Sequence, residues 1–495
     1  MPIFFGLFAL SLIIGLVTLI PHLGWTEIIE GQVGKQNFVA HMTEAFQKGD
    51  LLHGFPIRYF AEPWHPGPVA WAEEVPFYHV LSAGLARLFN VNSVTSGRIL
   101  SFAFGIFFLY AIYDLAKSLF SENKIAPYLA VLVLFWMPGF QIYSTSVIPD
   151  LAMAALVTFA YGRSLRKQVG LSYGVLLLAC LMKYFAVFAV LALFIYDCTR
   201  FPKWKERIRS FLYAGIAVLP TLAYLAYFII AKIPNPVTEY RTANGYGHLA
   251  GNFLFRAQFY LRFVTWVFIK DPNLIFALLG VGGFVLAVKN KVALSEKWRL
   301  PVIHFCTAVL FALIFASSFF VHDYYALTFM LPIALFATYA LSQIRIKPLV
   351  GAVITGSMVL TFLMVRDATF RLTNYVDAAK VVRDALSFVP DRSETDLVGF
   401  VSDFSLPPIP ILSKKSGWAF SANRLEDQRA FLTGKLSDPK LKAFVFYCRE
   451  PDADHYFVEW RNADSRLAQM KILKDQTFES EGRKGAKTRL VVLAP

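Results

Sequence analysis

Residues 170–198 read GLSYGVLLLACLMKYFAVFAVLALFIYDC, an apolar run with a charged side chain, Lys183, near its middle and a second, Asp197, at its end. A helix that crosses the hydrocarbon core of a membrane needs about 20 mostly apolar residues, so this run is too long for a single straight crossing. Lys183 and Tyr184 divide it into two halves. The pattern therefore predicts either one long tilted membrane helix or two shorter helices that meet at Lys183.

Nine other apolar runs make the chain a predicted polytopic helical membrane protein. They cover 3–22, 98–117, 125–143, 150–165, 209–232, 272–288, 299–320, 326–343 and 348–366. Hydrophobic residues make up 56% of the chain and charged residues only 17%, whereas soluble proteins carry about a quarter charged residues. No basic residue precedes the first run, as one would in a cleaved signal peptide, so we expect a retained first transmembrane helix.

Short basic clusters between the runs predict the topology, because basic loops stay in the cytoplasm. The clusters are Arg163, Arg166 and Lys167; the basic residues of 200–209; those of 289–299; and Arg345 with Lys347; Lys117 and Lys124 form a weaker one. Loops 23–97, 144–149, 233–271 and 321–325 and the segment after 366 then lie outside. The count is about eleven crossings if 170–198 crosses twice and 77–90 lies in the interface. In the second choice, 77–90 crosses and 170–198 crosses once, which would place the cluster at 163–167 outside.

Residues 367–495 differ from the rest of the chain, since charged residues become dense and apolar runs shorten to strand length. The predicted strands are 397–401, 441–447 and 489–493, and helical periodicity covers 375–387. We therefore expect a transmembrane domain over 1–366, with outer loops 23–97 and 233–271, and a small soluble α/β domain on the extracytoplasmic side over 367–495. The net charge of +14 belongs largely to the membrane loops, so no nucleic-acid partner is predicted.

Carboxylates gather near the predicted outer face of the membrane. Glu27 and Glu30 follow the first apolar run, Glu74 precedes 77–90, and Asp150 begins the run 150–165. Each has an ordinary structural explanation when taken alone, and Asp150 would be favourable at any helix N-terminus. Their occurrence at one depth in a charge-poor region favours a shared site.

Cations and aromatic residues are predicted at the same depth. An ionisable residue within a membrane segment, such as Lys183, indicates function by default, although snorkelling to the interface is the alternative. A lysine at this depth can hold a phosphate as a point charge. The predicted substrate-binding residues are Lys183, Tyr184, Arg241, His322, Tyr324 and Tyr325.

Other chemistries lack their motifs. The sequence contains no nucleotide-binding glycine loop, no metalloprotease motif and no paired cysteines, and its nine histidines are scattered. We predict no metal ligands and no cofactor, and dependence on a divalent metal stays open.

The order of the motifs resembles that of the GT-C glycosyltransferases, in particular the bacterial relatives of protein O-mannosyltransferases and of the lipid A aminoarabinose transferase. The resemblance covers roughly residues 1–366. It rests on Glu74-Val75-Pro76-Phe77-Tyr78, Gly97-Arg98-Ile99-Leu100-Ser101, Pro149-Asp150, Leu181-Met182-Lys183-Tyr184 and His322-Asp323-Tyr324-Tyr325-Ala326-Leu327. Each motif is weak by itself, and their order makes the match specific.

The resemblance implies an inverting transfer of a sugar from a polyprenyl-phosphate-linked donor to a lipid, glycan or protein acceptor at the outer face, expected to be the periplasmic face of a bacterial inner membrane. It implies that a carboxylate of the first outer loop serves as the general base or orients the acceptor. Many members carry Asp-Glu there, whereas this chain has Glu27-Ile28-Ile29-Glu30, so either glutamate could serve and we favour Glu30. Glu74 and Asp150 would support the acceptor or sugar, and Lys183 would hold the donor phosphate.

Two other classes of function compete with this one. A transporter or flippase for lipid-linked saccharides usually shows internal repeats, and none is visible in the sequence. A non-catalytic envelope assembly protein would act through residues 367–495 and would bind its partner through that domain alone.

Overall fold

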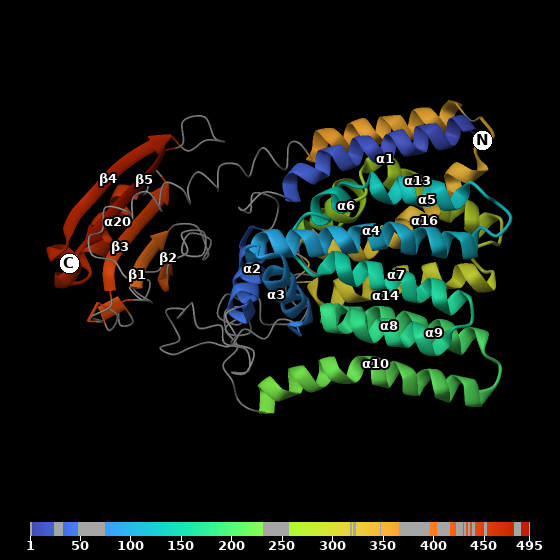
Figure 1. The fold of residues 1–495 in the computed structure, drawn as a ribbon, viewed down its shortest axis with the longest axis horizontal. Coiled ribbons are helices and arrows are strands. Elements are labelled where there is room, and N and C mark those ends of the chain that lie inside the picture. Colours follow the sequence, from blue (N-terminus) through green and yellow to red (C-terminus); the bar gives the residue numbers. More distant parts are fainter. Residues whose placement is uncertain are drawn as a thin grey trace. The chain divides into compact units, whose positions relative to one another are not determined.

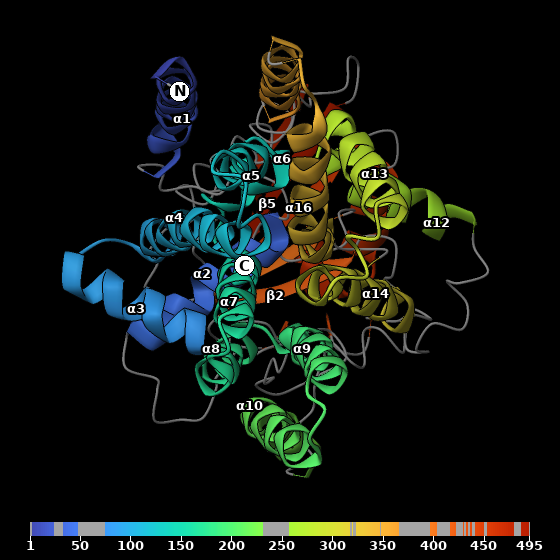
Figure 2. The same ribbon diagram turned by 90° about the vertical axis from the view of Figure 1, so that its right-hand side faces the viewer.

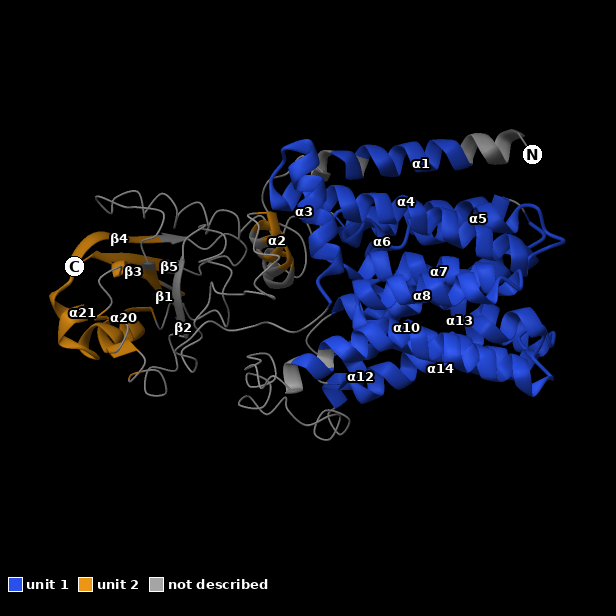
Figure 3. Cartoon of the chain, turned by 60° about the horizontal axis from the view of Figure 1, so that its bottom comes forward, with its two compact units in different colours: residues 1–26, 72–232, 238–367 blue, residues 27–71, 233–237, 368–495 orange. Residues whose placement is uncertain are grey.

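The computed structural model describes residues 2–23, 33–47, 75–230, 257–316, 319, 323–346, 348–365, 397–402, 416–421, 441–449, 453–479 and 487–494, with five single positions from 429 to 437. The chain divides into two compact units, drawn in blue and orange in Figure 3. The first consists of helices (Figure 1), and the second contains the helix α2 (Val33–Gln47) and a β-sheet.

The first unit is a bundle of apolar helices. Its elements are α1 (Pro2–Leu23), α3 (Phe77–Phe89), α4 (Ser93–Leu119), α5 (Ala126–Phe135), α6 (Pro138–Tyr143), α7 (Asp150–Leu165), α8 (Val169–Met182), η2 (Tyr184–Ala186), α9 (Val187–Arg200), α10 (Trp204–Ile230), α12 (Ala257–Val264), η3 (Thr265–Lys270), α13 (Leu274–Lys289), α14 (Glu296–Ile314), η4 (Asp323–Ala326) and α16 (Leu327–Gln343). Among the described residues, four helices are long and apolar enough to cross a membrane: Ser93–Leu119, Glu296–Ile314, Asp323–Gln343 and Pro348–Val365. Eleven crossings stay a prediction.

The run 170–198 forms a helical hairpin and not one long helix. Lys183 leaves α8 with extended backbone angles of φ −153° and ψ 124°, and η2 leads into α9. The end of α9 returns to the start of α8, where the Tyr173 hydroxyl donates to Asp197 Oδ2 over 3.0 Å. Figure 2 shows α8 and α9 end on as separate helices. The chain therefore turns back at Lys183.

The two ends of the bundle differ in charge. At the end where α7 finishes, Arg163 and Arg166 pair with the Asp114 carboxylate, and Arg200 Nη1 donates to the Ser164 carbonyl over 2.7 Å. Asp150 stands at the other end of α7, about 24 Å away at 1.5 Å per helical residue. The predicted basic cluster at 163–167 and the predicted site residue Asp150 therefore lie at opposite ends of this helix.

One apolar run and one predicted outer loop differ from what the sequence predicts. The run 125–143 is divided between α5 and α6 because Pro138 opens α6 and Met137 before it is extended, as residues preceding proline tend to be. The predicted outer loop 233–271 ends in helix over its described part: α12 and η3 form a pair with α13 that is bent by 97°.

Close packing of α13 on α16 depends on one glycine. A Cβ added to Gly283 would lie 1.9 Å from the carbonyl oxygen of Phe336, while a Cβ at Gly282 would meet nothing within 4 Å. Gly283→Ala is therefore expected to destabilise the protein by about 1–3 kcal/mol through overpacking. Thermal unfolding in detergent should show a lowered midpoint for Gly283→Ala and no lowering for the control Gly282→Ala. Equal midpoints for the two variants would contradict this packing.

The second unit contains a five-stranded mixed sheet in the order β2-β1-β3-β5-β4. Its elements are β1 (Leu397–Ser402), β2 (Ser416–Ser421), β3 (Leu441–Arg449), α20 (Ala453–Asn462), α21 (Ser465–Gln469), β4 (Lys471–Glu479) and β5 (Lys487–Ala494). Strand β1 is parallel to β2 and β3, whereas β5 is antiparallel to β3 and β4.

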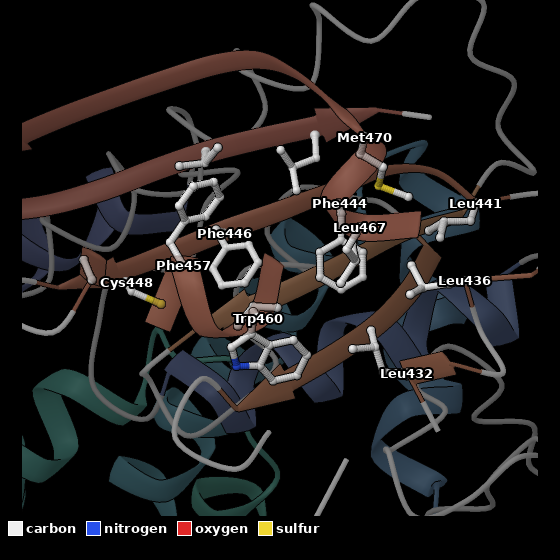
Figure 4. Close-up of a cluster of buried hydrophobic side chains, with 14 residues drawn as sticks. Leu432, Leu436, Leu441, Phe444, Phe446, Cys448, Phe457, Trp460, Leu467 and Met470 are labelled. Carbon is white, nitrogen blue, oxygen red and sulfur yellow. The ribbon is translucent and has the colours of Figure 1, made fainter. Parts of the chain in front are cut away.

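The core of this unit lies between the sheet and α20 (Figure 4). Trp460 and Phe457 of α20 pack with Phe446 of β3, their ring centroids lying 6.1 and 5.4 Å from that of Phe446. Asp464 caps α21, and hydrogen bonds from Arg466 lower the pKa of its carboxyl to about 2. The three predicted strands coincide with β1, β3 and β5, whereas β2 and β4 are additional, and the predicted helix at 375–387 lies outside the described residues.

Candidate active site

Half of the predicted site residues fall on described positions. Asp150, Lys183, Tyr184, Tyr324 and Tyr325 are described, and four of them lie together. Glu27, Glu30, Glu74, Arg241 and His322 lie outside the described residues.

The short segment before α7 holds Asp150 in place. Buried Arg98 of α4 donates from Nη1 to the Thr145 carbonyl over 2.7 Å, and the Tyr78 hydroxyl of α3 donates to the Gly97 carbonyl over 2.9 Å. Gly97 allows this segment to lie against α4, because a Cβ there would come within 2.4 Å of Val147. The Gly97-Arg98 motif therefore anchors the chain that delivers Asp150.

Asp150 and Lys183 form a buried ion pair. Asp150 begins α7, Lys183 ends α8, and Lys183 Nζ lies 3.4 Å from Asp150 Oδ2. The side chains are only 1% and 2% exposed, respectively. The hairpin at Lys183 and the helix start at Asp150 thus bring opposite charges together, which is the arrangement a charge needs when it is removed from water.

Aromatic rings enclose the ammonium group of Lys183. Its Nζ lies 5.2 Å from the ring centroid of Tyr324, 5.8 Å from that of Tyr325 and 5.9 Å from that of Phe185. Such distances permit cation–π attraction. Tyr184, the remaining described candidate, lies beside Phe185, with ring centroids 4.1 Å apart and ring planes tilted by 50°. Three segments that are distant in the sequence therefore surround one lysine.

A second charged cluster adjoins these rings, and two of its members, Lys270 and Asp271, were not predicted from the sequence. Asp323 immediately precedes Tyr324, and its Oδ1 accepts a 2.9 Å hydrogen bond from the Tyr143 hydroxyl of α6. Its Oδ2 pairs with the ammonium group of Lys270 at the end of η3. Tyr143 also interacts electrostatically with Asp150. The signal in the sequence was the charged pair Lys270-Asp271 between two apolar segments, to which the same argument applies as to Lys183.

Asp271 completes this cluster and fixes the end of η3. Its carbonyl accepts a 2.9 Å hydrogen bond from the amide of Gly139, and a Cβ at Gly139 would lie only 3.1 Å from the Asp271 Cβ. The Asp271 carboxyl is buried and interacts electrostatically with Lys270 and Asp323. Gly139 therefore permits the contact that places Lys270 beside Asp323.

The site combines carboxylates and ammonium groups in surroundings largely removed from water. Charges in such surroundings act more strongly on a reacting group than they do in solvent, because they are fixed in advance and poorly screened. Among the described residues no group of three or more histidine, cysteine, aspartate or glutamate side chains could hold a metal ion.

No protein-family model matches the sequence, and no curated protein matches it. Solved structures do match the fold. ArnT from Cupriavidus metallidurans, a lipid A aminoarabinose transferase solved bound to undecaprenyl phosphate, shares 13% identity with a TM-score of 0.64, over 99% of this chain and 98% of that one.

Two more distant structures match as well. The oligosaccharyltransferase AglB from Archaeoglobus fulgidus, solved with an inhibitory peptide and a dolichol-phosphate, shares 11% identity with a TM-score of 0.58, over 96% of this chain and 73% of that one. The arabinofuranosyltransferase AftD from Mycobacteria shares 13% identity with a TM-score of 0.50, over 95% of this chain and 40% of that one. The chain therefore has the fold of the GT-C glycosyltransferases, which confirms the resemblance seen in the sequence.

Proposed function

We propose that this protein is an inverting glycosyltransferase that moves a sugar from a polyprenyl-phosphate-linked donor to an acceptor at the outer face of the membrane. The observation that carries the proposal is the buried pair of Asp150 and Lys183 at the hairpin of a GT-C fold. Structures with this fold have been solved with undecaprenyl phosphate and with a dolichol-phosphate, which supports a lipid phosphate as the leaving group.

The reaction needs a base and a cation. A hydroxyl or amine of the acceptor attacks the anomeric carbon, the bond from that carbon to the phosphate oxygen breaks, and the electron pair leaves with the polyprenyl phosphate. The base accepts the acceptor proton, and we assign this role to Glu30, with Glu27 as the alternative. A single displacement of this kind inverts the anomeric carbon. Glu74 would support the acceptor or the sugar.

Lys183 supplies fixed positive charge to the leaving phosphate. Because the ammonium group is held by Asp150 and aromatic rings, no reorganisation is needed when negative charge develops. Asp150 keeps the lysine charged in a buried place and sets its position. Tyr324 and Tyr325 offer rings and hydroxyls to the sugar, and we propose His322 and Arg241 as further substrate-binding residues.

The distribution of basic residues along the bundle supports an extracytoplasmic location for the active site. The arginine pairs around Asp114 lie at the end of α7 opposite to Asp150, and basic ends face the cytoplasm. We therefore place the active site on the extracytoplasmic side, in a bacterial inner membrane. The acceptor is a lipid, glycan or protein of the cell envelope.

Deleting the gene in the organism that carries it is expected to remove one sugar from the envelope lipids, glycans or glycoproteins. The wild-type gene should restore that sugar, whereas Asp150→Asn should restore it poorly because Lys183 loses its partner. Mass spectrometry of the three envelope fractions measures the result. Glu296→Gln, at the other end of the bundle, is the control and should restore the sugar fully. An envelope unchanged by deletion, or restored equally by Asp150→Asn, would contradict the proposed function.

A further inference from the structure

The two lysines of the site differ sharply in their access to solvent. The Lys183 side chain is 2% exposed and lies against Asp150 and three aromatic rings. The Lys270 side chain is 39% exposed, although its partner Asp323 is only 5% exposed. Of the two lysines, Lys270 is therefore the one whose side chain is accessible from outside the bundle.

The Lys270 ammonium group is held in place with donors to spare. An ammonium carries three N–H donors, and its hydrogen bond within the described part of the chain goes to Asp323 Oδ2. Asp323 is itself fixed by the Tyr143 hydroxyl at Oδ1 over 2.9 Å. The backbone bond from Gly139 to Asp271 fixes the adjoining residue. The Lys270 ammonium group is therefore held in position by a hydrogen bond that, within the described residues, uses one of its three N–H donors.

The two lysines contact adjacent residues of the chain, Asp323 and Tyr324. Lys270 pairs with the Asp323 carboxylate, and Lys183 Nζ lies 5.2 Å from the centroid of the Tyr324 ring. Both cations therefore contact the start of η4. The Lys270 side chain is partly exposed to solvent, and the Lys183 side chain is buried. An anion bound at Lys270 would feel the charge of Lys183 through a poorly screened interior.

We infer that Lys270 makes the direct contact with the phosphate of the lipid donor. Lys183 attracts that phosphate electrostatically while its ammonium group stays paired with Asp150. This assignment rests on the proposed function. It divides the work of two cations: Lys270 contributes to donor affinity, and Lys183 contributes mainly to the rate of transfer. Without Lys270 the Asp323 carboxylate would face the anion with no cation between them, so the affinity for an anion should depend steeply on this lysine.

Binding of a matched pair of short isoprenoids tests the inference. The full-length protein in nanodiscs is titrated with farnesyl phosphate and with farnesol, which share a tail and differ in the phosphate. The ratio of the two affinities isolates recognition of the anion. For Lys270→Met we expect the preference for farnesyl phosphate to fall roughly 10- to 100-fold, as for a lost hydrogen bond to a charged group, and farnesol binding to be unchanged.

Charge-graded variants separate contact from folding. Lys270→Arg should keep most of the preference for farnesyl phosphate, and Lys270→Glu should abolish it. Lys289→Met, in the last turn of α13, is the control and should leave both affinities unchanged. Lys270→Arg keeps the ion pair and should unfold close to the wild-type midpoint. Lys270→Met and Lys270→Glu leave the buried Asp323 carboxylate without its cation and should unfold earlier, so all affinities are expressed per folded molecule.

The outcomes distinguish this inference from the proposed function. A preference for farnesyl phosphate that survives in Lys270→Met and Lys270→Glu but is lost in Lys183→Met would overturn the role of Lys270 and leave a phosphate-binding transferase intact. A wild-type protein with no preference for farnesyl phosphate over farnesol would overturn both. Reduced binding of farnesol in Lys270→Met, equal to the reduction for farnesyl phosphate, would show a structural role and also overturn the inference.

Discussion

Lys183→Met is expected to reduce sugar transfer by at least about 100-fold, as when a preorganised donor to a developing anion is removed. The same change should lower the free energy of unfolding by about 3–5 kcal/mol, because it leaves the Asp150 carboxylate buried without its charged partner. The expectation follows from the 3.4 Å contact between Lys183 Nζ and Asp150 Oδ2 and from the burial of both side chains.

The measurement has two parts, since lost folding alone would also lower activity. Thermal unfolding in detergent gives the stability, and transfer is expressed per folded molecule. Arg163→Met is the control, because it removes one of the two arginines that pair with buried Asp114 at the other end of α7. This control should lose stability and keep its transfer rate per folded molecule. Normal transfer by folded Lys183→Met would show that the lysine serves only the fold.

The double variant Asp150→Asn with Lys183→Met should recover most of the stability that Lys183→Met loses, and none of the transfer. Removing both charges avoids the uncompensated carboxylate, and neutral replacement of a buried ion pair is often tolerated or even stabilising by about 1–4 kcal/mol. The leaving phosphate still lacks the fixed cation, so transfer should stay at least about 100-fold below wild type.

Unfolding midpoints of the wild type, the two single variants and the double variant form a double-mutant cycle. We expect a coupling energy of about 0.5–3 kcal/mol or more for residues in direct contact. Additive losses would mean that the pair is not formed in the protein. Recovery of transfer together with stability would mean that Lys183 acts through the fold alone, with no direct effect on the reaction.

The sequence predicts the Asp150–Lys183 part of the site because membrane charges are expensive and must find partners. A lysine in the middle of 170–198 and an aspartate at a helix start can be assigned to one depth from their positions in the apolar pattern. The length of the apolar run left one long tilted helix and two shorter helices open, and the structure shows the hairpin at Lys183. The sequence predicted Tyr324 and Tyr325 only as members of the same outer cluster, and it did not predict that they enclose this lysine.

The Lys270 part of the site could not be predicted in the same way. Its position depends on the 97° bend between the segment that ends at Lys270 and α13, and on the approach of α6 that brings Tyr143 to Asp323. The contact of Tyr143 with Asp323 joins residues 180 positions apart, so no period in the sequence indicates it. The break between α5 and α6 was readable from Pro138, whereas strands β2 and β4 carry too few apolar residues to be seen as strands.

Release of polyprenyl phosphate by the reconstituted, purified protein tests the central claim most directly. Proteoliposomes are supplied with polyprenyl-phosphate-linked sugars and an envelope lipid extract, and free polyprenyl phosphate is measured with time. We predict release by the wild type with one of these donors, a product of inverted anomeric configuration, and at least about 100-fold slower release by Lys183→Met. Release that is equally fast in Lys183→Met, or a wild-type protein that moves the intact donor across the bilayer without releasing phosphate, would contradict a glycosyltransferase built on this site.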